Sequence, residues 1–345
     1  MHMLQRPDIA PWQGCRYPLS SARGHYESYF IRANDRLSPR ALWLRYTLFR
    51  PANQADAAVG ELWALYFDAR HSDSVAPQVR GVRQAFPLQQ CSFDRDRVDM
   101  RIGSAAITLG SAQGEASSDQ HQFLWDLQWA ARDNGLLLLP AELYRAPLPK
   151  AKSLVLSTHL DISGRLQLDD ETLDFEHWTG TLNHNWGSRH TDAYAWGQVC
   201  GFDNAPDAFL ECASARLRLG RVWSPQLTPV VLRLDGQTHA LNGLSTALRN
   251  TASYAPWQWR WEAGDDDIRI EGQLHAPSTC FAALHYGNPP GGNKICLNSK
   301  IAYCELLVRR KGRSPRRLVS EHGAAFEILT DTLPEGMHPL NAPVV

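Results

Sequence analysis

GTLNHNWGSRHTDAYAWGQVCGFD, residues 180–203, contains two strand patterns joined by the polar segment GSRHTD. Successive side chains of a strand point to opposite faces. In NHNWG, His184 and Trp186 therefore share one side, while Asn183 and Asn185 share the other. The segment predicts a strand, a turn and a second strand.

The second pattern, AYAWGQVCGF, has one large face and one small face. Tyr194, Trp196 and Gln198 lie on the large face with Cys200 and Phe202, whereas the opposite face holds only Ala, Gly and Val. A mostly apolar surface with a few placed polar groups is typical of a pocket wall. The alternative is that these aromatic residues only fill a core, as most Trp and Tyr residues in β proteins do.

The same period of two runs through most of the chain, as in HQFLWDLQWA and PWQWRWEAG. Turn-forming segments such as SGR (163–165), LDGQ and RKGRS separate the strand patterns. No long segment has a helical period, so we expect helices to be few and short. The sequence therefore predicts an all-β protein whose antiparallel strands close into barrels or stack as sandwiches to protect their edges.

A chain of 345 residues exceeds the usual size of one core, which predicts two domains or one large β domain. The Pro-rich stretch 140–152 and the GSRHTD segment 187–192 are candidate boundaries.

Composition disfavours several classes of partner and site. The formal net charge of −1 and the absence of long runs of like charge argue against nucleic acid, and the basic run 308–317 is interpreted as a hairpin tip. No apolar run approaches the length of a membrane span. Residues 1–20 lack the apolar core of a signal peptide, and seven scattered Cys residues fit reduced thiols, so we expect a cytoplasmic protein.

Local motifs for common cofactors are missing. The chain has no phosphate-binding loop, dinucleotide fingerprint, nucleophile elbow or HExxH motif, so we expect no cofactor. His177, His184 and His190 are spaced seven and six residues apart, but an odd spacing on a strand places His177 and His184 on opposite faces. We therefore expect no metal.

Glu211 is a candidate proton donor. It lies in AFLECASA, an otherwise apolar strand that would pair with the Trp196 strand if DNAPD forms a tight turn. A carboxyl group among apolar neighbours must be paired or have a shifted pKa. The alternatives are an ion pair with Arg216 or Arg218, or exposure on an outer face.

NHNWG followed by YAWGQ resembles the HNWG signature and following strand of the carotenoid 1,2-hydratase (hydroxyneurosporene synthase) and AttH-like family, to which tocopherol cyclases are distantly similar. HYESYFIRANDRLSPRALWLRYTLFRP and GELWALYFDA extend the resemblance, which covers roughly residues 24–330. The resemblance implies two lipocalin-like barrels, at residues 1–185 and 186–345. It also implies a hydrophobic ligand site in or between them.

The resemblance implies cofactor-independent hydration or cyclisation of an isoprenoid or polyene. It assigns His184, Asn185, Trp186, Trp196 and Gln198 to the site. The family often has an acidic residue before the His, and Asn183 stands there. This difference removes one expected proton relay.

Three hypotheses remain. In the first, a cofactor-free lyase or isomerase uses His184 and Glu211 for proton transfer, with Asn185, Trp186, Tyr194, Trp196 and Gln198 binding the ligand. The aromatic faces would support a cation. In the second, a non-catalytic carrier binds a lipophilic molecule in the same pocket. In the third, the aromatic clusters are core and the partner is another protein. Peripheral contact with a membrane remains open in each.

Overall fold

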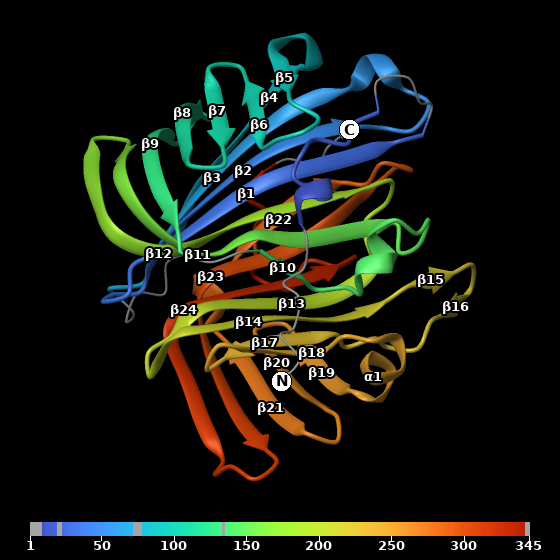
Figure 1. Ribbon diagram of the computed structural model, residues 1–345. Helices are drawn as coiled ribbons and strands as arrows, with labels where there is room; N and C mark the ends of the chain where they lie inside the picture. Colours follow the sequence, from blue (N-terminus) through green and yellow to red (C-terminus); the bar gives the residue numbers. More distant parts are fainter. Residues whose placement is uncertain (1–8, 19–22, 72–77, 133–134, 342–345) are drawn as a thin grey trace.

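The computed structural model describes residues 9–18, 23–71, 78–132 and 135–341 (Figure 1). Parts of the N-terminal segment considered for a signal peptide, residues 1–8 and 19–20, lie outside this description. Almost all regular structure in these ranges is antiparallel β-sheet, and the single α-helix found there, α1 (Leu244–Arg249), is short, as the sequence predicts. Among the described residues no helix has the length and apolar character needed to cross a membrane.

Among the residues that the structure describes, sheet A contains twelve strands, all within 25–187. In spatial order they are β4 (Val79–Pro87), β3 (Val59–Asp68), β2 (Arg40–Arg50), β1 (His25–Asn34), β12 (Glu171–Gly187), β11 (Ala151–Leu168), β9 (Gln122–Ala131), β8 (Ser111–Ser117), β7 (Ala105–Thr108), β6 (Asp99–Ile102) and β5 (Cys91–Phe93), with β10 (Leu136–Leu137) beside β11.

Sheet B contains ten strands in the described part of the chain, all within 193–330. In spatial order they are β18 (Gln237–Leu241), β17 (Val230–Leu234), β14 (Ala205–Arg216), β13 (Ala193–Phe202), β24 (Arg316–Thr330), β23 (Asn293–Arg310), β21 (Ile268–His275), β20 (Gln258–Gly264) and β19 (Thr251–Ala255), with β22 (Ala282–Gly287) beside β23. A small hairpin, β15 (Arg218–Leu219) and β16 (Val222–Trp223), stands apart.

Five short 3₁₀ helices complete the described elements. They are η1 (Ala10–Trp12), η2 (Ala55–Ala57), η3 (Leu88–Gln90), η4 (Ala141–Tyr144) and η5 (Ser278–Cys280).

The predicted all-β class is confirmed. Sheet A, blue to green in Figure 1, curves into a nearly closed barrel, and sheet B, yellow to red, forms a half-barrel against it. The sheets divide the chain between Gly187 and Ala193, within the second candidate boundary. The domain ranges 1–185 and 186–345 themselves stay a prediction.

Strands β1, β2 and β3 are buried on both faces, which explains their nearly continuous apolar sequences. Leu42 and Leu44 point into the core of sheet A. Trp43, between them, joins the core of sheet B, together with Trp63 of β3. The outer face of the barrel therefore completes the half-barrel, and the few polar side chains on that face become buried between the two sheets.

The turn predicted at SGR is wrong, because β11 runs through it. The β11–β12 register shifts between Ile162 and Gly164 instead of reversing. Gly164 has φ +145, and a Cβ added there would lie 2.1 Å from the carbonyl oxygen of Asp126. The glycine therefore permits a bulge at a close approach of two backbones.

Candidate functional site

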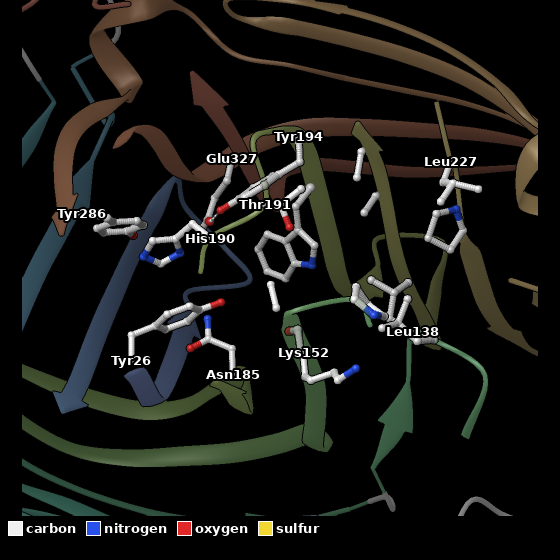
Figure 2. A pocket seen from close by; sticks show the side chains of 18 of the residues that line it. Tyr26, Leu138, Lys152, Asn185, His190, Thr191, Tyr194, Leu227, Tyr286 and Glu327 are labelled. Carbon is white, nitrogen blue, oxygen red and sulfur yellow. Dashed lines mark hydrogen bonds between the residues drawn. The ribbon is translucent and has the colours of Figure 1, made fainter. Parts of the chain in front are cut away.

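A cavity of about 200 Å³ lies between the outer face of sheet A and sheet B. Its two ends differ in chemistry. Leu138 and Leu227 line one end, while Tyr26 and His190 line the other (Figure 2). The cavity therefore has an apolar end and a polar, aromatic end, the arrangement expected for a lipophilic ligand with one polar group.

His190 lies in the polar end, on the segment that joins β12 to β13. Its ring stacks on Tyr26, with 4.0 Å between centroids, and faces Tyr286 on the other side. Nε2 lies 3.1 Å from the carbonyl oxygen of Gly287. Because a carbonyl only accepts, Nε2 carries the proton and Nδ1 is an acceptor. Burial, reinforced by the positive charge of Arg45, lowers the pKa of His190 to about 3, so the ring is neutral near pH 7.

Two tyrosines supply neutral hydroxyls. Burial raises the pKa of Tyr26 and of Tyr194, so both stay protonated. Figure 2 shows the Tyr26 hydroxyl directed inward beside Asn185, and Glu327 between His190 and Tyr194. The Tyr194 hydroxyl is 3.4 Å from Glu327 Oε2.

The carboxylate of Glu327 is held from the side of sheet B. Its Oε1 accepts from Lys300 Nζ at 2.6 Å and from Asn298 Nδ2 at 3.0 Å. These charge-assisted bonds fix the position of the carboxylate beside the cavity.

Three of the sequence-predicted ligand residues lie on this cavity wall. Tyr194 and Trp196 reach it from β13, and Asn185 reaches it from β12. The side-chain oxygen of Asn185 is buried without a hydrogen-bond partner among the described residues.

Glu211 lies behind Trp196 and does not itself line the cavity. β13 and β14 pair as predicted, and Gln198 stands opposite Glu211. The indole Nε1 of Trp196 donates to Glu211 Oε1 at 3.2 Å, while Oε2 has no partner in the described part of the chain. Burial raises the pKa of Glu211 to about 8, although the Trp196 hydrogen bond and the charge of Arg32 oppose the rise.

The alternatives considered for Glu211 do not occur. Arg216 and Arg218 are exposed and make other contacts: Arg216 Nε donates to the carbonyl oxygen of Ser224, and the Arg218 backbone N–H donates to Asp192. Glu211 is therefore a buried acid that is protonated at neutral pH.

Gln198 connects the two sheets. Its Nε2 donates to Asn183 Oδ1 at 2.8 Å, and its Oε1 accepts from the Thr181 hydroxyl at 2.9 Å. Asn183, which replaces the acidic residue of the family pattern, thus contributes to a neutral network between the sheets. All three side chains are buried.

The structure does not bring His184 and Trp186 to this cavity. They project from the other face of β12 into the core of sheet A. His184 Nε2 is 2.8 Å from Glu27 Oε1, and its Nδ1 is 2.8 Å from the carbonyl oxygen of Trp12. Both ring nitrogens of His184 are therefore in hydrogen-bond contact with atoms of the sheet A core and not with the cavity.

Glu27 is the ionised partner in that cluster. Burial by itself would raise its pKa, but the hydrogen bonds from His184 and His25 outweigh burial and lower the pKa to about 2. The backbone N–H of Arg16 also donates to Glu27 Oε1, at 2.6 Å. His184 therefore fixes the N-terminal segment to the barrel.

Sequence reasoning missed most of the polar end. The rule that selected Glu211, a charged residue within an apolar strand, applies equally to Arg45 in ALWLRYTLF and to Glu327 in AAFEILT. No local signal marked Tyr26 or Tyr286. No group of three or more His, Cys, Asp or Glu residues within the described ranges is placed to hold a metal.

Several solved structures share this architecture. An AttH candidate from Nitrosomonas europaea aligns with a TM-score of 0.57 and 12% identity, covering 94% of this chain and 99% of its own. The chain has the AttH-like fold. Kievitone hydratase of Nectria haematococca gives a TM-score of 0.55 at 8% identity, covering 90% of each chain. CghA, solved with Sch210972, aligns with a TM-score of 0.54 at 10% identity, covering 89% of this chain and 88% of its own.

Sequence comparisons are less informative about activity. Two uncharacterized proteins of Mycobacterium tuberculosis, from strains CDC 1551 and H37Rv, are each 23% identical over 283 residues, which span 81% of this chain and 80% of theirs. No family model matches the sequence. The predicted resemblance is therefore confirmed for the AttH-like fold, and the chemistry must be argued from the cavity.

Proposed function

We propose that this protein binds a lipophilic small molecule between its two sheets. We further propose that it catalyses a cofactor-independent hydration, elimination of water or cyclisation of that molecule. The cavity carries the proposal, because it combines an apolar end with a polar end of aromatic rings and neutral proton donors. The shared fold with kievitone hydratase supports the reaction class.

The residues of the cavity wall suit such chemistry. The Tyr26 hydroxyl donates a hydrogen bond, and His190 Nδ1 accepts one, so together they can orient a polar group or a water molecule. The rings of Trp43, Tyr194 and Trp196 limit the conformations of an unsaturated ligand and exclude bulk water. An isoprenoid or a polyene fits these walls.

The second candidate function is a non-catalytic carrier. One observation favours it: neither residue predicted to transfer protons lies on the cavity wall. His184 is held by Glu27 and Trp12 in the other core, and Glu211 lies behind Trp196. A carrier needs only the cavity.

The first experiment asks whether the cavity is occupied. Purified protein is extracted with solvent, and the extract is analysed by mass spectrometry. We expect a co-purified lipophilic molecule in the wild type and its loss in Ala213→Trp, which fills the cavity wall. Gln128→Trp, on the exposed face of β9, is the matched control and should retain the molecule. Equal retention by both variants would refute the cavity as the binding site.

The second experiment separates enzyme from carrier. The extracted molecule is returned to ligand-free protein and followed by liquid chromatography with mass detection. Appearance of an isomer, or of a product differing by one water, identifies a catalyst. An unchanged molecule, bound and released intact, identifies a carrier.

A further inference from the structure

We propose that the polar end of the cavity binds an anionic oxygen headgroup, a carboxylate or an enolate, and that Arg45 is its counterion. The inference rests on the proposed function and specifies its substrate class. The ligand would be a lipophilic acid whose headgroup lies at Arg45 and whose tail runs toward Leu138 and Leu227.

Arg45 projects from β2 between the sheets and is only 5% exposed. Its Nε donates to the Ser28 hydroxyl at 3.0 Å, the one hydrogen bond it makes with the described part of the chain. The guanidinium lies 4.4 Å from the ring centroid of Tyr286. Since guanidinium carries five N–H donors, most of its donor capacity is unused on the cavity wall.

Burial by itself would lower the pKa of Arg45, but its neighbours, the carboxylates of Glu327 and Glu61 among them, raise it, and each of these carboxylates is hydrogen-bonded to a different cation. Glu61 Oε1 is 2.6 Å from Arg83, and Glu327 Oε1 is 2.6 Å from Lys300. Both carboxylates nearest to Arg45 thus have another cation as their direct partner. Arg45 has no direct carboxylate partner within the described ranges, so a ligand anion could form the first charge-assisted hydrogen bond with its free N–H groups.

The other groups that face Arg45 cannot supply a negative charge. Burial raises the pKa of Tyr194 and Tyr286, and burial together with Arg45 lowers that of His190, so all three are neutral. The Tyr26 hydroxyl, also neutral, is a second donor for the same headgroup. The site is therefore complementary to an anionic oxygen.

Lys300, the partner of Glu327, lies behind two indole rings of the cavity wall. Its Nζ lies 5.3 Å from the ring centroid of Trp43 and 5.4 Å from that of Trp196. These indoles already interact with a cation, so they support a carbocation on the ligand less well than bare rings would. Fixed positive charge instead stabilises negative charge that develops on oxygen.

This electrostatic field selects among the proposed reactions. Water can add across a double bond conjugated to the headgroup, so that its oxygen bonds to the β carbon and a proton goes to the α carbon. The negative charge passes through the headgroup oxygen beside Arg45. The step needs no oxidant or reductant.

Isothermal titration with two ten-carbon probes tests the inference. Geranic acid has the carboxylate, and geraniol has the same tail with an uncharged alcohol. We expect the wild type to bind geranic acid at least about tenfold more tightly than geraniol, because a buried charge-assisted pair is worth about 1.5–3 kcal/mol. Arg45→Met should remove this preference, whereas Arg269→Met, on an exposed arginine of β21, should keep it.

Equal affinity of the wild type for both probes would overturn the anionic headgroup and leave the proposed function standing. Binding of neither probe would count against both. If Arg45→Met does not fold, a second measurement on the wild type tests the inference. In that case the pKa of carboxyl-labelled geranic acid, followed by ¹³C NMR, should fall on binding, and an unchanged or raised pKa would refute the inference.

Discussion

The protonated state of Glu211 makes the stability of the fold depend on pH, and the substitution Glu211→Gln would remove this dependence. Its pKa rises from 4.5 to about 8 on folding because the carboxyl group is buried. Between these values the folded protein binds a proton that the unfolded chain has released. The stabilising contribution is therefore complete below about pH 4.5 and is lost as the pH rises to about 8.

The magnitude follows from the shift. Each pH unit within the window lowers the free energy of unfolding by about 1.4 kcal/mol, for a total on the order of 5 kcal/mol. Glu211→Gln keeps an oxygen that can accept from Trp196 Nε1, but it does not titrate. We expect the free energy of unfolding of the variant to match that of the wild type within about 1 kcal/mol at the acidic end of the window. At the alkaline end it should exceed that of the wild type by several kcal/mol.

Chemical denaturation across the window provides the assay. At each pH, the free energy of unfolding of the wild type is subtracted from that of the variant. The contributions of all other titrating groups, which the two proteins share, cancel in this difference. Glu115→Gln, on the exposed face of β8, is the control and should give a difference that is flat with pH. A flat difference for Glu211→Gln would show that Glu211 is already ionised, with Arg32 as its partner, and would refute the reasoning.

Two further predictions concern residues of the opening sequence segment. His184→Gln removes one of the two imidazoles that hydrogen-bond the buried carboxylate of Glu27 and leaves His25 in place, so we expect the free energy of unfolding by denaturant to fall by about 1–3 kcal/mol; no loss would mean that the His184–Glu27 hydrogen bond is absent. Gln198→Ala leaves Asn183 Oδ1 unpaired between the sheets, and we expect a loss of about 1–3 kcal/mol. Asn183→Ala should lower the free energy of unfolding less when it is made in the Gln198→Ala variant than when it is made in the wild type. If the two losses simply add, the hydrogen bond between Asn183 and Gln198 is contradicted.

Much of the fold follows from period-two alternation. The pattern around Trp196 correctly separates a large face from a small one, and Glu211 stands on the strand predicted to pair with it. Unbroken apolar runs such as ALWLRYTLF match strands buried on both faces. The bulge at Gly164 escaped prediction, because a glycine that permits a bulge and a glycine that permits a turn have the same local signature.

The sequence by itself determined that His184 and Asn185 point to opposite faces, because alternation is a property of the strand. Only the tertiary structure decided which face meets the cavity, since β12 is covered on both sides. Tyr26, Arg45 and Glu327 come from β1, β2 and β24, and only the packing of sheet B on the outside of sheet A places them in one site. Side-chain direction is local, whereas a buried charge acquires its neighbours only when distant strands pack around it.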